Sequence, residues 1–264
     1  MIIITWNVYG KNRRVAKLLD FAFSKNPDII CLQEIPFKAL ENLKNRQGYH
    51  IFYTEDIENV RENKNTYICT LTKQKPEKTD TLEYFDRETH SLLNDVLYKK
   101  INKNLEKHRA TLTYLTFGQR EVVITNARLS CAVGTNDRLE QFENMLKNLN
   151  LENTNIVCGD FNVVDSKFFN RATGWIRGLK KADYLTNERQ AFEKLCEKYK
   201  LKNIFLGAPT TIFPKIKLQF DHILVSPELP VTHKEISRKG FGSDHKMLLI
   251  NLEIEPTDKI STLD

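Results

Sequence analysis

The sequence predicts an α/β protein with mixed rather than purely parallel β-sheets. Short runs rich in β-branched residues alternate along the whole chain with stretches in which apolar residues recur at helical spacing. The segment 117–121, FGQRE, lies between two strand-like runs and predicts a hairpin turn, which requires antiparallel neighbours. No repeat, low-complexity tract or Pro/Gly/Ser-rich linker divides the chain, so we expect residues 1–264 to form a single domain.

The individual elements follow from these patterns. The predicted strands cover residues 1–6, 27–33, 49–54, 66–72, 109–117, 121–127, 154–159, 220–225 and 247–254. The predicted helices carry core-facing stripes formed by Val15, Leu18, Leu19 and Ala22, by Leu139, Phe142, Met145, Leu146 and Leu149, and by Phe192, Leu195, Cys196 and Tyr199. Asn187, with Gln190 three residues later, predicts the start of the last helix.

Residues 93–105 are also expected to form a helix. Leu93, Leu97 and Leu105 recur on one face of this segment, and lysines, including Lys99 and Lys107, lie on the other. This lysine-rich face is interpreted either as an ordinary solvated surface or as a basic binding surface.

Composition predicts a folded protein with a slight preference for anionic partners. Hydrophobic residues make up 41% and charged residues 28% of the 264 residues, which is typical of globular chains. The net charge of +6 suits a phosphate-rich substrate, although surface lysines also serve solubility alone.

The five cysteines are odd in number, widely spaced and without a CxxC pair, so neither a disulfide framework nor a zinc knuckle is expected. The opening MIIITWNV lacks the basic lead and apolar length of a signal peptide, and no apolar run approaches the ~20 residues of a membrane span. We therefore expect a cytoplasmic protein. The sequence leaves the oligomeric state open, and a monomer is favoured.

Polar residues follow several of the predicted strands at the points where they end. Asn7 follows the first strand, Glu34 the second, and Asp160 with Asn162 the strand 154–159. Loops that leave the strand ends of α/β proteins present polar side chains around a crevice. These residues are therefore candidates for one site.

Further candidates lie near the C-terminus, where Asp221 precedes the run ILV and Asp244-His245 precedes the run MLLI. Taken singly, each of these residues has an ordinary reading as a turn, a cap or a surface charge. Taken together, the set points to chemistry. Carboxylate and amide oxygens suit Mg²⁺ or Mn²⁺, whereas the lack of clustered Cys and His argues against zinc.

The blocks TWNVYG, CLQE, GDFN, FDHILVS and GSDH, in this order, resemble those of the endonuclease/exonuclease/phosphatase superfamily, which includes DNase I and the exonuclease III-type apurinic endonucleases. The resemblance spans nearly the whole chain. It implies a DNase I-like fold, a four-layer α/β/β/α sandwich with two central mixed β-sheets.

The resemblance also implies a divalent-metal site with Mg²⁺ or Mn²⁺ as the cofactor. Glu34 would be the principal metal ligand, with Asn7 assisting and Asp244 as a further carboxylate on the metal side. These positions match the motifs TWNVYG, CLQE and GSDH.

The remaining motif residues would carry the reaction. Asp160 would position or deprotonate the attacking water, and Asn162 would bind the scissile phosphate. His245 would hydrogen-bond a phosphoryl oxygen or transfer a proton, and Asp221 would fix its tautomer and orientation.

The function expected from this set is a metal-dependent phosphodiesterase, and our leading hypothesis is a nuclease acting on DNA or RNA. The alternative is a phosphatase or phosphodiesterase acting on phosphoinositides, nucleotides or other small phosphate esters. A non-catalytic anion-binding module is a third hypothesis, which the complete set of acids, amides and histidine disfavours.

The sequence departs from the superfamily pattern at Arg128. Many members carry a Thr-His-Leu block after the strand that matches 121–127, whereas this chain has Ala127-Arg128-Leu129. An arginine can bind phosphate with two N–H groups but cannot exchange protons near neutral pH. Arg128 is therefore predicted to contact substrate phosphate, with a surface arginine as the alternative.

Two further segments bear on the substrate. Residues 186–189, TNER, resemble a helix segment of exonuclease III-type enzymes and favour nucleic acid, but the Gly-Trp-Arg block of those enzymes is replaced by KLQ before Phe220. An abasic-site pocket is therefore in doubt. Arg171, Trp175 and Arg177 combine an aromatic ring with cations, which predicts either a nucleic-acid loop or a packed tryptophan on a basic surface.

Overall fold

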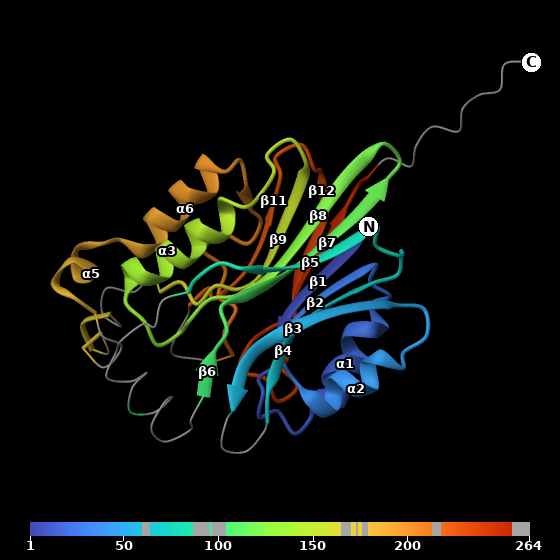
Figure 1. The fold of residues 1–264 in the computed structure, drawn as a ribbon, viewed down its shortest axis with the longest axis horizontal. Coiled ribbons are helices and arrows are strands. Elements are labelled where there is room, and N and C mark those ends of the chain that lie inside the picture. Colours follow the sequence, from blue (N-terminus) through green and yellow to red (C-terminus); the bar gives the residue numbers. More distant parts are fainter. Residues whose placement is uncertain are drawn as a thin grey trace, which may run out of the picture.

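The computed structural model describes residues 1–59, 64–86, 96, 104–164, 170–172, 174–175, 179–212 and 218–254. Two β-sheets pack face to face at the centre of the molecule, and helices cover the outer face of each sheet (Figure 1). This arrangement confirms the expected four-layer α/β/β/α sandwich.

The first sheet has the strand order β12-β13-β1-β2-β4-β3-β6. Its only parallel pair among the described strands is β1 with β2, in which Ile3 pairs with Ile29 and Asn7 with Gln33. Its strands are β1 Ile2–Asn7, β2 Ile29–Pro36, β3 His50–Asn59, β4 Thr66–Thr72, β6 Asn104–Glu106, β12 Val231–Ile236 and β13 Leu248–Leu252.

The second sheet has the order β10-β11-β9-β8-β7-β5 and repeats this plan. Strands β8 and β9 are parallel, with Ala127 opposite Gly159 and Arg128 opposite Asp160. The predicted hairpin is confirmed, because β7 and β8 are antiparallel and Phe117 pairs with Arg120. The strands are β5 Lys78–Glu83, β7 Arg109–Phe117, β8 Arg120–Arg128, β9 Thr154–Asp160, β10 Lys202–Asn203 and β11 Asp221–Val225.

Successive side chains of each strand point to opposite faces of its sheet, so both faces of each sheet are packed and the molecule has three apolar layers. One face of each sheet contributes to a central core that contains Ile3, Cys31, Ile124 and Ile156. The opposite face of the first sheet packs against α1 (Val15–Ser24) and α2 (Phe37–Lys44). The outer face of the second sheet packs against α3 (Thr135–Leu146) and α6 (Glu188–Lys198), while the short α5 (Lys181–Leu185) lies beyond them.

A buried polar layer joins the two sheets near the strand ends. The Gln33 amide donates to Thr5 Oγ1 at 3.0 Å and to Asn126 Oδ1 at 2.7 Å. The Asn126 amide donates in turn to Thr70 Oγ1, which lies 2.7 Å from Thr111 Oγ1. Because buried polar groups require these partners, the layer fixes the position of one sheet relative to the other.

The predicted strands and helical stripes are found in the structure, and Asn187 caps α6 by accepting a hydrogen bond from the Gln190 backbone N–H. The helix expected over residues 93–105 is wrong at its end, because Leu105 lies in strand β6, where it pairs with Glu58. Residues 93–95 and 97–103, including Lys99, lie outside the described residues. Lys107 forms an ion pair with Glu58.

The structure adds α2, α5, β5, β6, β10 and β12 to the predicted elements. Strands β5 and β12 lie at the edges of their sheets and carry exposed polar residues, such as Asp80 and His233, in place of an apolar pattern. Charged edge strands are common because they prevent association between sheets. Among the described residues, no helix combines the length and hydropathy needed to cross a membrane.

Candidate active site

The parallel strand pairs deliver four of the candidate side chains to one end of the sandwich. Asn7 ends β1 and Arg128 ends β8, while Glu34 lies near the end of β2 and Asp160 ends β9. Asp221 begins β11 and pairs in register with Asp160 across the antiparallel ladder. Residues far apart in sequence therefore meet because parallel neighbours end at the same edge.

Glu34 is directed into the site by a β-bulge. The register between β2 and β4 shifts between Leu32 and Ile35, and Glu34 has a left-handed φ of 55°. Bulges redirect side chains in this way, and such a conformation persists in a non-glycine residue only where its surroundings hold it. Glu34 Oε2 accepts the Gly10 N–H at 3.1 Å, and Oε1 accepts the Arg128 Nε–H at 3.1 Å.

These contacts keep Glu34 ionised. Burial alone would raise the pKa of its carboxyl, but the Arg128 charge and the hydrogen bonds from Asn7 and Gly10 hold the pKa below its ordinary value. An ionised carboxylate at this position is a suitable ligand for a hard divalent cation.

Asn7 links the two principal acids. Its Nδ2 donates to Glu34 Oε1 at 3.0 Å and to Asp160 Oδ2 at 2.8 Å, while its Oδ1 accepts the Tyr9 N–H. The amide therefore presents its N–H groups to the acids, and its contribution to a metal site would be to orient Glu34.

Asp160 and Asn162 are held by a tight turn after β9. A Cβ at Gly159 would lie 1.9 Å from the carbonyl oxygen of Ala127, so only glycine fits where β8 approaches. Asn162 has a φ of 52°; its backbone N–H donates to Asp160 Oδ1 and its side-chain amide donates to the carbonyl of Leu129. Burial raises the pKa of Asp160 to about 6, with His245 opposing the shift and Asp221 adding to it.

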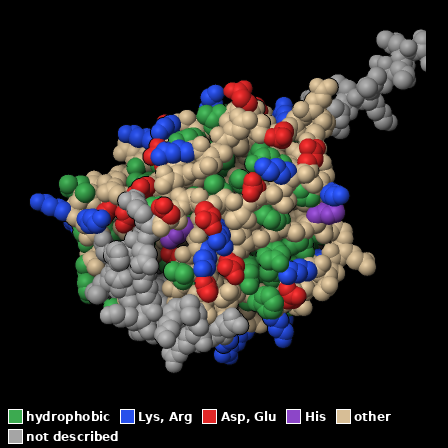
Figure 2. Space-filling model, in the orientation of Figure 1, with side chains coloured by type: hydrophobic (Ala, Val, Ile, Leu, Met, Phe, Trp, Pro, Cys, Tyr) green, Lys and Arg blue, Asp and Glu red, His purple; other side chains and the backbone are tan. Residues whose placement is uncertain are grey.

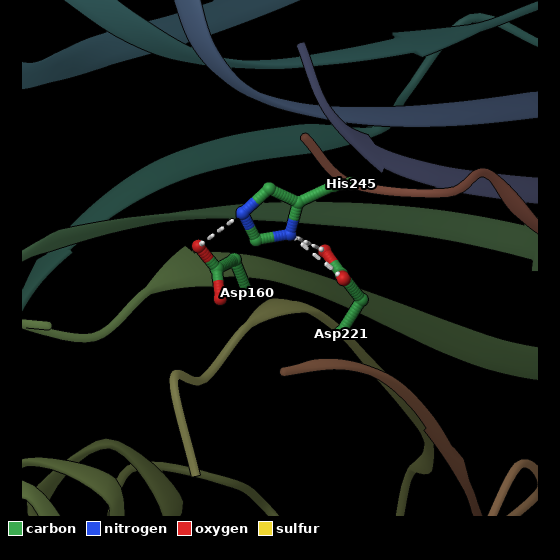
Figure 3. Close-up of side chains that lie close together, drawn as sticks. All are labelled: Asp160, Asp221 and His245. Atoms are coloured by element: carbon green, nitrogen blue, oxygen red, sulfur yellow. Dashed lines mark hydrogen bonds and ion pairs between the residues drawn. The ribbon is translucent and has the colours of Figure 1, made fainter. Parts of the chain in front are cut away.

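His245 lies between two carboxylates (Figure 3). Its Nδ1 is 2.9 and 3.1 Å from the two carboxylate oxygens of Asp221, and its Nε2 is 3.9 Å from Asp160 Oδ2. Burial would lower the pKa of His245, but Asp221 and Asp160 raise it to about 10. The two carboxylates therefore favour the protonated imidazolium, whose Nε2 faces Asp160.

The loop that carries His245 is fixed to β1. The Trp6 indole N–H donates to the His245 carbonyl at 3.0 Å. The Ser243 hydroxyl donates to the Asn7 carbonyl and accepts the His245 N–H. These contacts hold the histidine in register with the strand that ends in Asn7.

Asp244 is half-buried beside the imidazole, with Oδ1 3.9 Å from His245 Nε2. Burial raises the pKa of Asp244, and its Oδ1 is buried with no hydrogen-bond partner among the described residues. Ligand atoms of Asp160, Asp221 and His245 also lie within 4.8 Å of one another, close enough to surround a metal ion. Oxygen donors predominate here, which fits Mg²⁺ or Mn²⁺.

Arg128 is 4% exposed, so the alternative of a surface arginine is wrong. Besides Glu34, its guanidinium contacts Asp56 Oδ1 at 3.3 Å and Glu106 Oε1 at 3.1 Å. Burial raises the pKa of Asp56 to about 7, whereas the pKa of Glu106 lies at about 2 because His108 and Arg128 outweigh its burial. Three carboxylates thus surround one guanidinium.

The sequence did not point to Asp56 or Glu106. Asp56 lies on the same buried face of β3 as Thr54, two residues beyond the predicted end of this strand. An acid at an inward strand position is a signal that could have identified it. Glu106 gave no such signal, because β6 forms only by pairing with β3.

Removing the Arg128 charge is expected to destabilise the fold. Arg128→Met would leave the surrounding carboxylates without a counter-charge, and uncompensated buried charges cost about 3 kcal/mol or more. Urea denaturation should show this loss, with a smaller one for the charge-conserving control Arg128→Lys. Equal unfolding free energies for Arg128→Met and the wild type would contradict this role.

The predicted nucleic-acid loop is described in part. Trp175 is 62% exposed, so the alternative of a packed tryptophan is wrong, and Arg171 is also exposed. Arg177 lies outside the described residues.

A two-sheet α/β sandwich with acids, amides and an Asp-oriented histidine at one edge defines the DNase I-like class of phosphoester hydrolases. The model of the Endonuclease/Exonuclease/phosphatase family matches residues 4–245, and the chain belongs to this family. Family members are hydrolases that act on phosphoesters and generally depend on divalent metals.

Solved structures share the fold at low sequence identity. The endonuclease/exonuclease/phosphatase from Beutenbergia cavernae aligns over 96% of this chain and 71% of its own, with a TM-score of 0.72 and 13% identity. The human Nocturnin catalytic domain aligns over 96% and 94%, with a TM-score of 0.68 and 18% identity. An AP endonuclease from Archaeoglobus fulgidus aligns over 96% and 100%, with a TM-score of 0.63 and 16% identity. No curated protein matches the sequence significantly.

Proposed function

We propose that this protein is a Mg²⁺- or Mn²⁺-dependent nuclease that hydrolyses phosphodiester bonds in DNA or RNA. The observation that carries the proposal is the single hydrogen-bonded and ion-paired group that joins Glu34, Asn7 and Asp160 to His245 and Asp221. It combines an ionised carboxylate, a buried carboxylate with a raised pKa and a protonated histidine at one edge of the sandwich.

Each side chain has a defined part in this reaction. Asp160 would take the proton of the attacking water, and the His245 imidazolium would donate from Nε2 to a phosphoryl oxygen. The amide of Asn162 has a second N–H beyond the one given to Leu129, and this group would bind the phosphate. Mg²⁺ or Mn²⁺ held by Glu34 and Asp244 would neutralise phosphate charge.

Nucleic acid is favoured over a small ester by the protein's charge and its structural neighbours. The net charge of +6 suits a polyanion. Two proteins that share this fold support the choice: an AP endonuclease from Archaeoglobus fulgidus, and TDP2 from D. rerio, which is seen complexed with a single-strand DNA product.

A substrate panel tests the proposal. Purified protein is incubated with plasmid, abasic duplex, RNA, inositol phosphates and an aryl phosphodiester, each with Mg²⁺, Mn²⁺ or EDTA. We expect metal-dependent cleavage of DNA or RNA that EDTA abolishes. Turnover of small esters alone would overturn the nuclease in favour of the alternative, a phosphatase or phosphodiesterase for such esters.

For Arg128 we propose contact with substrate phosphate through the one Nη2 N–H that its carboxylate partners leave available. Arg128→Lys keeps the charge but loses the planar fork, so the KM of the substrate is expected to rise about tenfold. Steady-state kinetics on the folded variant measure this. An unchanged KM and rate would leave Arg128 with its role toward Glu34 alone.

A further inference from the structure

Large apolar side chains lie exposed together around α5. Trp175 is 62%, Tyr184 41% and Leu185 83% exposed. A Cβ at Gly174 would lie 2.8 Å from the Tyr184 hydroxyl, so this tyrosine lies against the backbone that leads directly into Trp175. In Figure 2, hydrophobic and basic side chains protrude side by side at the end of the molecule where α5 lies in Figure 1.

The buried side chain of Asp183 anchors α5. The Asp183 side chain is 3% exposed; Oδ1 accepts the Asn136 N–H at 2.9 Å and Oδ2 accepts the Lys180 N–H at 2.6 Å. The first contact ties α5 to the N-terminal turn of α3. Tyr184 lies on this anchored helix, so its ring loses little conformational freedom when a ligand binds, which favours binding.

One loop connects this surface to the candidate active site. Residues 129–134 connect β8 to α3. At one end of this loop Leu129 donates its N–H to the Asp160 carbonyl and accepts the amide of Asn162. At the other end, a Cβ at Gly134 would lie 2.8 Å from Asp183 Oδ2.

The charges around these rings select the kind of ligand. Arg171, Lys180 and Lys181 are exposed, whereas Asp183, the single acid among the described residues of the segment 170–186, is buried and hydrogen-bonded. A ligand with flat apolar faces and regularly spaced negative charges matches rings flanked by cations. Unpaired nucleotides have this chemistry, while the bases of an intact duplex are already stacked.

We propose that Trp175 and Tyr184, flanked by Arg171, Lys180 and Lys181, form a stacking platform for unpaired nucleotides of the substrate. We call these five residues the α5 platform. The inference rests on the proposed function and extends it, because it assigns single-stranded DNA or RNA, or an unpaired end, as the preferred substrate class.

Intrinsic fluorescence tests the platform directly, because the chain has two tryptophans and Trp6 is fully buried. Binding is measured in EDTA with oligodeoxythymidine, oligouridine, a blunt duplex and a base-free deoxyribose phosphate chain, each of about 10 nucleotides. The single strands should quench Trp175, and the base-free chain should not. Quenching by either oligonucleotide supports the platform, and the one that quenches shows whether the platform binds DNA or RNA. Equal quenching by the base-free chain would overturn it.

Variants separate stacking from charge. Trp175→Ala should weaken single-strand binding about tenfold, and Trp175→Phe should largely retain it. The control Phe37→Ala removes a ring that is 53% exposed on α2 and should change nothing. Replacing both Lys180 and Lys181 by Ala should lower the salt slope by about 1.4. Unchanged affinity in a folded Trp175→Ala protein would overturn the platform.

Hydrolysis of an aryl phosphodiester with Mn²⁺ is measured on the same proteins, so the two proposals can fail separately. Turnover without quenching by oligonucleotides would overturn the α5 platform alone. Quenching without turnover of any phosphodiester would overturn the nuclease and leave a nucleic-acid-binding surface.

Discussion

Glu34→Gln is expected to lower kcat/KM about 1,000-fold, because it removes the charge of the predicted principal metal ligand while keeping the shape of the side chain. A metal ion contributes several kcal/mol of transition-state stabilisation, and about 4 kcal/mol corresponds to three orders of magnitude in rate. Cleavage assays over a range of Mn²⁺ concentrations measure the loss. Higher Mn²⁺ should recover part of the rate if the variant still binds metal weakly.

The same variant should remain folded, which separates a metal role from a structural one. Glutamine keeps an oxygen that can accept the Gly10 N–H, and Arg128 retains Asp56 and Glu106 as partners. Wild-type protein should gain thermal stability when Mn²⁺ is added, because a ligand that binds only the native state stabilises it. Glu34→Gln should lose this gain, whereas the surface control Glu41→Gln should keep both the gain and the activity. A full gain in Glu34→Gln would reject Glu34 as the ligand.

The sequence predicted those parts of the site that follow apolar runs. Asn7, Glu34 and Asp160 each interrupt a buried strand at its end, and such a local pattern is readable without knowledge of the fold. Their convergence could be expected once the strands were taken as neighbours. The fold followed in the same way, because core strands and amphipathic helices carry strong hydrophobic periodicity.

The surroundings of Arg128 could not be predicted, because they depend on contacts between distant segments. Glu106 reaches the Arg128 guanidinium because β6 pairs with β3, which places Glu106 opposite Ile57. Asp56 arrives from the same strand at an inward position. The residue type suggested a phosphate contact or a surface arginine, whereas the structure shows a buried cation that holds Glu34. Long-range pairing of short strands leaves little trace in local sequence.

Asp221→Asn is expected to lower kcat by about 1,000-fold or more while leaving KM nearly unchanged. Asp221 is fully buried, and both its carboxylate oxygens lie within hydrogen-bond distance of His245 Nδ1. An asparagine carries no negative charge to hold the imidazolium protonated, so the neutral ring would be a much weaker acid at Nε2 toward the phosphoryl oxygen. In serine protease triads the equivalent change costs about 10⁴-fold in kcat. Single-turnover kinetics report the chemical step.

A double-mutant cycle decides whether Asp221 acts through the histidine or touches the metal. If Asp221 only orients His245, Asp221→Asn should cost little more in a His245→Ala background, because residues that act as a unit give strongly non-additive losses. If Asp221 instead bound a metal together with Asp160, as their 4.8 Å grouping with His245 would permit, the two losses would add and Mn²⁺ affinity would fall in the single variant. His245 Nδ1 lies 2.9 Å from Asp221, whereas His245 Nε2 lies 3.9 Å from Asp160. Because Asp221 is in direct contact with the histidine, we expect the non-additive result.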